Sequence, residues 1–303
     1  MKDTIIITGA YGQDGSILSK ILRKKNYNII GIVKRLDKNR GSDNIDYISL
    51  NLDKKIEIKK LIKKKKIKTI VHFASNNEPY INKSNLEYLK YYKKNYKITQ
   101  NLIESIIEID REIQFLFAGS SQMLSSNKKN IININSKYNK SKSNYIRYKI
   151  DSEKLLFKLK KQYSLKITSM ILFNHDSLYR SNNFLIKRII NYAKKYDINE
   201  LKKLYRLNIK GDFSHADDIN TAIYLLIKKN NLNLDRIILS SNKLTKINDF
   251  IIQVLEKLNL KETFKNVKIL TNNSYKIGNN KLAIKLLKWK PKKNLNNIIS
   301  KIK

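Results

Sequence analysis

A glycine-rich segment close to the N-terminus constrains the fold of this chain more than any other feature. Residues 8–15 read Thr-Gly-Ala-Tyr-Gly-Gln-Asp-Gly, between an apolar run, Thr4–Ile7, and a segment with apolar residues at helical spacing, Ser16–Leu22. This order predicts a strand, a tight turn and a helix. Glycines spaced in this way let a pyrophosphate lie close to a helix N-terminus, where free N–H groups favour an anion. Since the 303 residues include just 8 glycines, their clustering here favours a nucleotide site over a plain turn.

Short apolar segments alternate with amphipathic segments along most of the chain. The expected strands after the first are Asn28–Val33, Thr69–Phe73, Gln114–Ala118, Lys166–Phe173 and Arg236–Leu239. The expected helices after the first are Lys54–Lys64, Leu86–Ile109, Asn144–Tyr163 and Ala216–Lys229. Such alternation predicts an α/β fold with a doubly wound parallel sheet, the Rossmann arrangement, covered by helices on both faces. Ligands of such sheets bind at the carboxyl ends of the strands.

The alternation is absent from residues 174–211 and from the stretch after about residue 244. We therefore expect a Rossmann domain made of residues 1–173 and 212–243. A smaller, interleaved C-terminal domain, made of residues 174–211 and 244–303, is expected to cover the carboxyl ends of the strands and bind substrate.

The formal net charge of +38 comes from lysines spread over the whole chain. This distribution indicates a compositional bias, and with no recognisable nucleic-acid motif we do not expect a nucleic-acid partner. The absence of cysteine excludes disulfides and thiolate metal sites, and we expect no metal. No apolar run approaches the roughly 20 residues that span a bilayer, so a cytoplasmic protein without a membrane partner is expected.

Two pairs of residues suggest redox chemistry on a nucleotide cofactor. Lys34 and Arg35 follow the second expected strand, where an NAD site usually has an acidic residue, and this favours the extra phosphate of NADP. Tyr145 and Lys149 form Tyr-x-x-x-Lys, which puts both on one face of a helix. A nearby ammonium is expected to lower the tyrosine pKa, so that the pair acts as general acid or base toward a sugar hydroxyl or ketone. Ser120 and Ser121 follow the fourth strand, where a hydroxyl either contacts the reacting oxygen or forms a strand-end turn.

With these motifs in order, the chain resembles the extended short-chain dehydrogenase/reductases, and within them the GDP-mannose 4,6-dehydratases. The loop at Gly9–Gly15 is close to that family's T-G-x-x-G-Q-D-G, and Gly31–Arg35 resembles its G-I-V-R-R. Ile171–Ser177, the most specific match, is very near I-L-F-N-H-E-S. Lys210–Ala216 resembles K-R-D-W-G-H-A, and Leu287–Pro291 is like L-G-W-K-P.

The resemblance implies roles for individual residues. It implies a catalytic set of Ser121, Tyr145 and Lys149, with Ser121 at the family's threonine position. It implies NADP binding by Gly9, Gly12, Gln13, Asp14, Gly15, Lys34, Arg35, Tyr145 and Lys149. Asn174 is implied to contact the substrate or to hold the loop beside the nicotinamide. A homodimer or homotetramer acting on a nucleotide sugar, GDP-linked by the resemblance, is the implied assembly and partner.

Several positions depart from the family. After its fourth strand the family reads S-T-S-E-L-Y-G, and beginning that motif at Ser120 places Met123 where the catalytic glutamate stands. A thioether cannot exchange the proton that dehydration requires. Gly211 replaces an arginine implied to bind the substrate diphosphate, Tyr179-Arg180 keeps half of a paired arginine motif, and Asn51 stands in place of an Asp.

The cofactor half of the pattern is thus retained, whereas the dehydration half is not. The first interpretation is an NADP(H)-dependent nucleotide-sugar enzyme of the dehydratase type that transfers hydride at sugar C4. The alternatives are a nucleotide-sugar C4 reductase or dehydrogenase, and a non-catalytic family member that binds a dinucleotide. A role in nucleic-acid binding, based on charge alone, ranks last.

Overall fold

The computed structural model describes residues 3–37, 45–76, 85–141, 143–260, 264, 266–271 and 274–302. Its centre is a seven-stranded sheet in the order β10-β7-β5-β4-β1-β2-β3, with every neighbouring pair parallel. The strands are β1 (Thr4–Thr8), β2 (Asn28–Val33), β3 (Asp46–Ser49), β4 (Ile67–His72), β5 (Gln114–Ser120), β7 (Ile167–Leu172) and β10 (Arg236–Leu239). Because the chain winds outward from β1 in both directions, the predicted doubly wound Rossmann sheet is confirmed.

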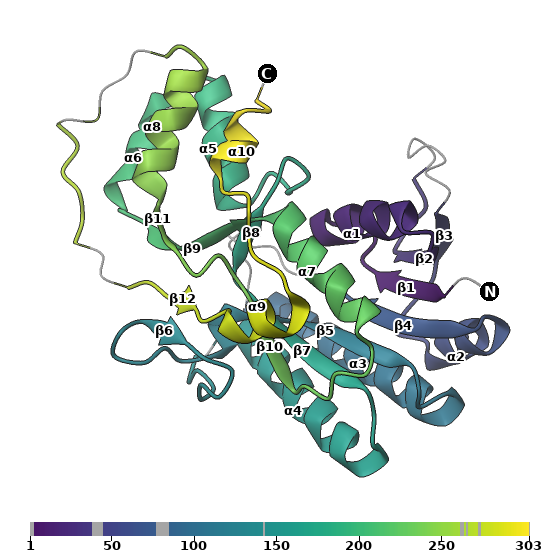
Figure 1. Cartoon of the computed structure of the whole chain (residues 1–303). Helices are drawn as coiled ribbons and strands as arrows, with labels where there is room; N and C mark the ends of the chain where they lie inside the picture. The colour runs from purple at the N-terminus through teal and green to yellow at the C-terminus, as the bar shows by residue number, and fades with distance from the viewer. Residues whose placement is uncertain are drawn as a thin grey trace.

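Helices cover both faces of this sheet (Figure 1). One face carries α1 (Gln13–Lys24), α7 (Ala216–Lys228) and α9 (Lys281–Leu287); the other carries α2 (Lys55–Lys64), α3 (Asn85–Ile109) and α4 (Asn144–Tyr163). The first strand shows why both faces are covered. Ile5 and Ile7 belong to the apolar cluster under α1, while Ile6 belongs to the cluster under α3. A strand that buries successive side chains on opposite faces reads as a continuous apolar run.

A second lobe stands beyond the carboxyl ends of the strands. It contains a three-stranded sheet in the order β11-β9-β8 and four helices. Its elements are β8 (Asn174–Asp176), β9 (Lys210–His215), β11 (Leu244–Lys246), α5 (Leu185–Lys194), α6 (Ile198–Arg206), α8 (Ile247–Lys257) and α10 (Asn296–Ile299). Side chains from α5, α6, α8 and α10 form a separate apolar core, and Figure 1 shows these helices gathered apart from the large sheet.

Smaller elements complete the fold next to the site. A single 3₁₀ turn, η1 (Ser121–Met123), follows β5 directly. Two short strands, β6 (Ile131–Ile132) and β12 (Ile277–Gly278), pair in parallel beside the main sheet. These elements hold the segment between β5 and α4 in place.

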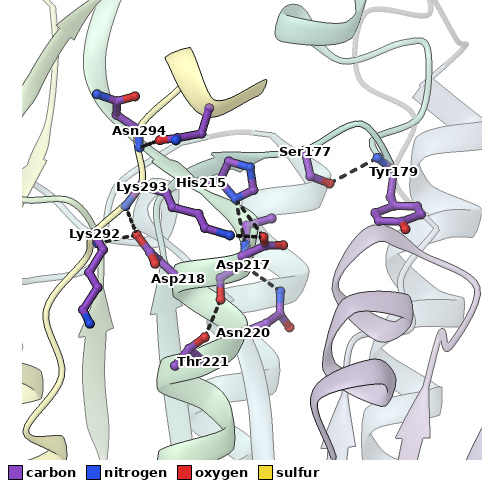
Figure 2. A network of polar contacts seen from close by, with 12 residues as sticks. Ser177, Tyr179, His215, Asp217, Asp218, Asn220, Thr221, Lys292, Lys293 and Asn294 are labelled. Atoms are coloured by element: carbon purple, nitrogen blue, oxygen red, sulfur yellow. Dashed lines mark hydrogen bonds and ion pairs between the residues drawn. The ribbon is translucent and has the colours of Figure 1, made fainter. Parts of the chain in front are cut away.

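The C-terminal segment is fastened to the start of α7, as Figure 2 shows. The carboxylate of Asp218 accepts the backbone N–H groups of Lys292 and Lys293 at 2.6 and 2.5 Å. The ammonium of Lys293 also lies 2.6 Å from Asp217, which is in the first turn of the same helix. This anchor leads the chain from the Rossmann layer into the second lobe.

Most expected elements match to within two residues, and the differences have physical reasons. The strand β3 was not predicted, because it is an edge strand whose four residues are all exposed or partly exposed. Residues 281–289 fall in the range expected for the substrate domain, yet Ala283, Leu287 and Trp289 pack into the core beneath α7. That stretch therefore belongs structurally to the large sheet. Residues 212–215, expected in the Rossmann domain, lie instead in β9, which pairs with β8 and β11 in the second lobe. The remaining domain boundaries stay a prediction.

Candidate functional site

A cavity of about 730 Å³ opens at the carboxyl ends of the central strands. It extends from the glycine loop, past the ends of β4 and β5 and the start of α4, to residues 172–184 at the entrance to the second lobe. All the predicted cofactor residues of the glycine loop line it, as do Ser121, Tyr145, Lys149 and Asn174. Chain segments as distant in sequence as Gly9 and Phe184 therefore meet at the edge where doubly wound folds bind ligands.

The glycine loop has the backbone form that its sequence predicts. Gly9 has a φ of +71°, a conformation that favours glycine. A Cβ on Gly15 would lie 2.5 Å from the carbonyl oxygen of Gly9, so the helix can approach the loop only without a side chain there. Gly12 caps α1 and no side chain occupies the cap. The N-terminus of α1 is consequently open to an anion in the cavity.

The side chains of Gln13 and Asp14 are held by residues 175–177, at and just after β8, and by Asn220 of α7, rather than directed freely into the cavity. The Gln13 amide donates to the carbonyl oxygen of His175 at 3.0 Å and accepts from the Ser177 hydroxyl at 2.9 Å. The Asp14 carboxylate contacts the His175 ring at 3.0 Å and the Asn220 amide at 2.9 Å. His175 and Ser177 belong to the most specific family match, but no role toward Gln13 or Asp14 was expected for them or for Asn220, because each lies more than 150 residues from its partner.

Lys34 and Arg35 are exposed directly after β2. The end of β2 touches the glycine loop, since the N–H groups of Gly9 and Ala10 both donate to the Ile32 carbonyl oxygen. The two cations do not line the cavity itself but stand at its margin. Such a position suits contact with a phosphate at the outer end of a dinucleotide.

The predicted catalytic pair lies on the first turns of α4 with both side chains at the cavity wall. The Lys149 ammonium donates to the Ala118 carbonyl oxygen at 2.6 Å, and burial lowers the pKa of Lys149 to about 7. Burial also raises the pKa of Tyr145, against the opposing effects of a hydrogen bond with the Ser120 side chain and the charge of Arg180. Tyr145 therefore carries its proton at neutral pH.

The pKa of Tyr145 thus differs from expectation, since Lys149 was expected to lower it. Two causes are visible. The phenol loses solvation in the cavity wall, and the ammonium of Lys149 is directed to Ala118, with its nitrogen 6.0 Å from the Tyr145 ring centroid. The pair keeps its predicted place on one helix face, but its resting form is a protonated phenol.

The turn after β5 corrects the predicted position of the family glutamate. Met123 is fully buried, and its sulfur accepts the N–H of Ser120 at 3.1 Å. Gln122, by contrast, is exposed and lines the cavity. Shifting the motif S-T-S-E-L-Y-G back by one residue puts the threonine at Ser120, the glutamate at Gln122 and the leucine at Met123. The shift agrees with burial, because the apolar residue then points inward and the polar one faces the cavity.

The same shift bears on the predicted catalytic serine. Ser121 does line the cavity, and its role stays a prediction. The hydrogen bond with Tyr145, however, comes from Ser120, whose hydroxyl also accepts the Gln122 N–H at 3.2 Å. Ser120 therefore fits the threonine position of the motif better than Ser121 does.

Asn174 and Arg180 line the cavity at the entrance to the second lobe, whereas Gly211 does not line it. Asn174 is exposed on β8 and lines the cavity. Arg180 also lines it, with its guanidinium 3.6 Å from the ring centroid of Phe184 and 3.4 Å from Asp176. Gly211 is buried, and a Cβ there would meet only the Phe213 ring, at 3.6 Å.

The described residues contain neither a metal-binding cluster nor a membrane-spanning helix. Those residues contain no cluster of three or more His, Asp or Glu side chains placed to hold a metal ion. Within the same ranges, no helix has both the length and the apolar character that crossing a membrane requires.

Comparison with known proteins agrees with the fold. The chain is 24% identical over 249 residues to the human GDP-mannose 4,6 dehydratase, a match that covers 75% of this chain and 65% of that enzyme. A relative from Arabidopsis thaliana, GDP-mannose 4,6 dehydratase 2, is also 24% identical, over 74% of this chain and 64% of its own length. The chain thus spans less than two thirds of the length of these relatives.

Solved structures of low sequence identity share the fold. A UDP-glucose 4-epimerase superimposes with a TM-score of 0.82 and 17% identity, over 98% of this chain and 95% of its own. A dTDP-glucose 4,6-dehydratase from Bacillus anthracis, solved in complex with NAD, gives 0.80 and 17%, over 99% and 95%. Residues 5–238 of this chain match the model of the NAD dependent epimerase/dehydratase family. With the glycine loop, the parallel sheet and the Tyr145–Lys149 pair in place, the chain belongs to the NAD dependent epimerase/dehydratase family.

Proposed function

We propose that this chain is an NADP(H)-dependent enzyme that transfers hydride at C4 of a nucleotide sugar and does not dehydrate the sugar. One observation carries the proposal. The cavity that begins at the open N-terminus of α1 ends at Ser120, Tyr145 and Lys149, and its wall presents Gln122 in place of an acid.

The residues present fit a dinucleotide. The glycine loop leaves space next to the helix N-terminus, because Gly12 is exposed and no side chain caps α1. Lys34 and Arg35 would bind a 2′-phosphate at the margin of the site and so favour NADP. When bound, the nicotinamide donates or accepts the hydride, and everything else is done by the side chains of this chain.

Tyr145 is the proposed acid and base. Its protonated resting form suits donation of a proton to a carbonyl oxygen as hydride arrives, and it takes the proton back in the reverse direction. The Ser120 hydroxyl, already bonded to Tyr145, would hold the same substrate oxygen. Lys149, which is buried next to Tyr145 and has a pKa near 7, would balance the phenolate charge when the proton leaves.

Dehydration in the family pattern uses a carboxylate that removes the C5 proton, and the described residues that line the cavity include no free carboxylate. The amide of Gln122 cannot exchange a proton as a carboxylate does. Among the described residues that line the cavity, Asp14 is the sole carboxylate, and it is already bound by His175 and Asn220. This observation favours a C4 redox reaction over a complete 4,6-dehydration.

The proposed substrate class rests on similarity. The human and Arabidopsis relatives are named for GDP-mannose, which favours a GDP-linked sugar, while the superimposed structures are named for UDP- and dTDP-sugars. The absence of an arginine at Gly211 indicates that the diphosphate is bound differently from the family pattern. Arg180, which lines the cavity, is a cation that could take that role. The homodimer or homotetramer and the cytoplasmic location stay predictions.

The proposal is tested by incubating the pure protein with NADP or NADPH and a panel of GDP-, UDP- and dTDP-sugars and their 4-keto derivatives. Mass spectrometry of the products then distinguishes the reactions. A change of two hydrogens, or a 4-epimer of unchanged mass, supports C4 hydride transfer. A product lighter by one water contradicts the absence of dehydration, and no product with any of the sugars favours the non-catalytic alternative. The Tyr145→Phe variant is the matched control for background turnover.

A further inference from the structure

The side chain of His175 lies between the carbonyl oxygen of Phe173 and the carboxylate of Asp14, and both groups can only accept hydrogen bonds as long as Asp14 is ionised. Its Nδ1 lies 2.6 Å from the carbonyl oxygen of Phe173, and its Nε2 lies 3.0 and 3.1 Å from the two carboxylate oxygens of Asp14. A neutral imidazole has one donor and one acceptor nitrogen, whereas an imidazolium has two donors. The contacts therefore require a proton on both nitrogens. Because His175 is only 6% exposed, its positive charge is stabilised by these protein partners and hardly by water.

The surroundings of Asp14 also favour its ionised form. The amide of Asn220, whose place on α7 is seen in Figure 2, donates to the Asp14 carboxylate at 2.9 Å. Burial alone would raise the pKa of Asp14, but His175, Arg180 and Asn220 together lower it to about 2. Burial would likewise lower the pKa of His175, but the Asp14 carboxylate outweighs it and raises that pKa. The other charged groups that face the ring are Arg180 and, more remotely, Asp176.

This pair lies where charge matters most for an anionic ligand. Asp14 is in the first turn of α1, whose open N-terminus lines the cavity. A bare carboxylate at that place would repel a pyrophosphate. The Asp14–His175 contact also joins two walls of the cavity, the glycine loop and β8. Gln13 reinforces this connection, because it donates to the His175 carbonyl oxygen and accepts from the Ser177 hydroxyl.

We infer that His175 is a positioning residue that works as a permanent imidazolium: it cancels the charge of Asp14 next to the dinucleotide pyrophosphate and ties the glycine loop to the strand that carries Asn174. The part concerning the dinucleotide rests on the proposed function. The charge state of His175 does not, and it can be measured on the protein alone.

The first experiment is a pH titration of the histidine ¹⁵N and Cε1–H NMR signals of the ligand-free wild-type protein. The chain contains 3 histidines, and two of them are internal controls. The nitrogens of His72 contact hydroxyls of Thr8 and Thr99, and Nδ1 of His215 accepts the Asp217 N–H, so both rings can be neutral. We expect one imidazolium and two neutral rings at pH 7.5, with the imidazolium signal lost in Asp14→Asn. Three neutral rings at pH 7.5 would overturn the inference.

The second experiment measures NADP binding by calorimetry at pH 7.5 for His175→Gln and for the double variant Asp14→Asn/His175→Gln. The single change leaves Asp14 uncompensated, and we expect the Kd to rise about tenfold or more, which corresponds to about 1.4 kcal/mol. The double change removes both charges and keeps an amide pair, and we expect most of the affinity to return. A histidine with a merely structural role would instead make the double variant bind as poorly as the single one, or worse.

Thermal unfolding of each variant without ligand shows whether a loss of binding is a loss of fold. A wild-type protein that binds no dinucleotide would contradict the proposed function, while the NMR titration would still decide the charge of His175. Full affinity in His175→Gln, with the NMR signal of an imidazolium in wild type, would refute the role toward the pyrophosphate.

Discussion

The turn after β5 makes a prediction that separates two neighbouring residues. We expect Gln122→Glu to be tolerated and Met123→Glu to unfold the protein. The reason is burial: Gln122 is exposed at the cavity, whereas Met123 has no exposed surface and packs in an apolar cluster with residues such as Ile146 and Phe173. The members of this cluster are apolar side chains and tyrosines, which cannot form an ion pair with a new carboxylate.

The magnitude follows from the two environments. Removing the fully buried Met123 side chain gives up roughly 1.5–3 kcal/mol of apolar burial. An unpaired carboxyl in its place costs several kcal/mol more, either as a buried charge or through the pKa shift that neutralises it. Because a domain is stable by only about 5–15 kcal/mol, this sum removes most of the free energy of unfolding. Gln122→Glu exchanges one exposed polar group for another and is expected to stay within about 0.5 kcal/mol.

The assay is urea denaturation followed by circular dichroism at pH 7 for wild type and both variants. The penalty in Met123→Glu has a definite pH dependence. Since burial raises the folded pKa of that carboxyl above its unfolded value of about 4.3, the destabilisation is full above the folded pKa and fades as the pH falls toward the unfolded one. Equal denaturation midpoints for the two variants, or a lower midpoint for Gln122→Glu, would refute the placement of the turn. In Gln122→Glu, a new 4-keto-6-deoxy product would further show that the cavity lacked only its acid.

Three further outcomes are expected. Tyr145→Phe should lower turnover by roughly 100- to 10,000-fold with an unchanged Kd for NADP, because only the transferred proton is lost; parallel kinetics and calorimetry check both values, and wild-type turnover would exclude the residue. Lys34→Ala/Arg35→Ala should abolish the preference for NADP over NAD, with the exposed pair Lys63→Ala/Lys64→Ala as the charge-matched control; calorimetry with both dinucleotides measures it, and an unchanged preference would contradict the assignment. Lys149 has a pKa of about 7 in the folded protein and about 10.5 in the unfolded chain, so the free energy of unfolding should rise as the pH increases from 7 to 10.5, by about 1.4 kcal/mol per pH unit at most. Urea denaturation at a series of pH values measures this rise, and Lys149→Met should lose it.

The central sheet was predictable from the sequence because each buried strand is a short apolar run between turn residues. The strand at 28–33 and the helix at 144–163 were predicted with their observed bounds. The α5 helix was not predicted, although Ile186, Ile189, Ile190 and Ala193 follow the spacing of a buried helix face. The expectation there rested on the strand–helix alternation, which the second lobe does not follow.

The site was predictable where it depends on local spacing and failed where it depends on distant contacts. The glycine loop and the Tyr145–Lys149 pair needed only neighbours in sequence. The family motif was aligned one residue too far along the chain, which put Met123 at the glutamate position. The apolar character of Met123 and Leu124, which are both fully buried, was the sequence signal against that alignment. His175 could not be assigned a role, because its charge is determined by a carboxylate 161 residues away.

The second lobe has a consequence for how such a chain can change during evolution. Its apolar core is assembled from three separate passages of the chain, contributed by α5 and α6, by α8, and by the C-terminal α10. Recombination with a related gene at a single point between α5 and α10 would exchange one or two of these passages and leave a core built from parts that did not evolve together. A single side-chain substitution in the lobe leaves the pairing of the three passages intact.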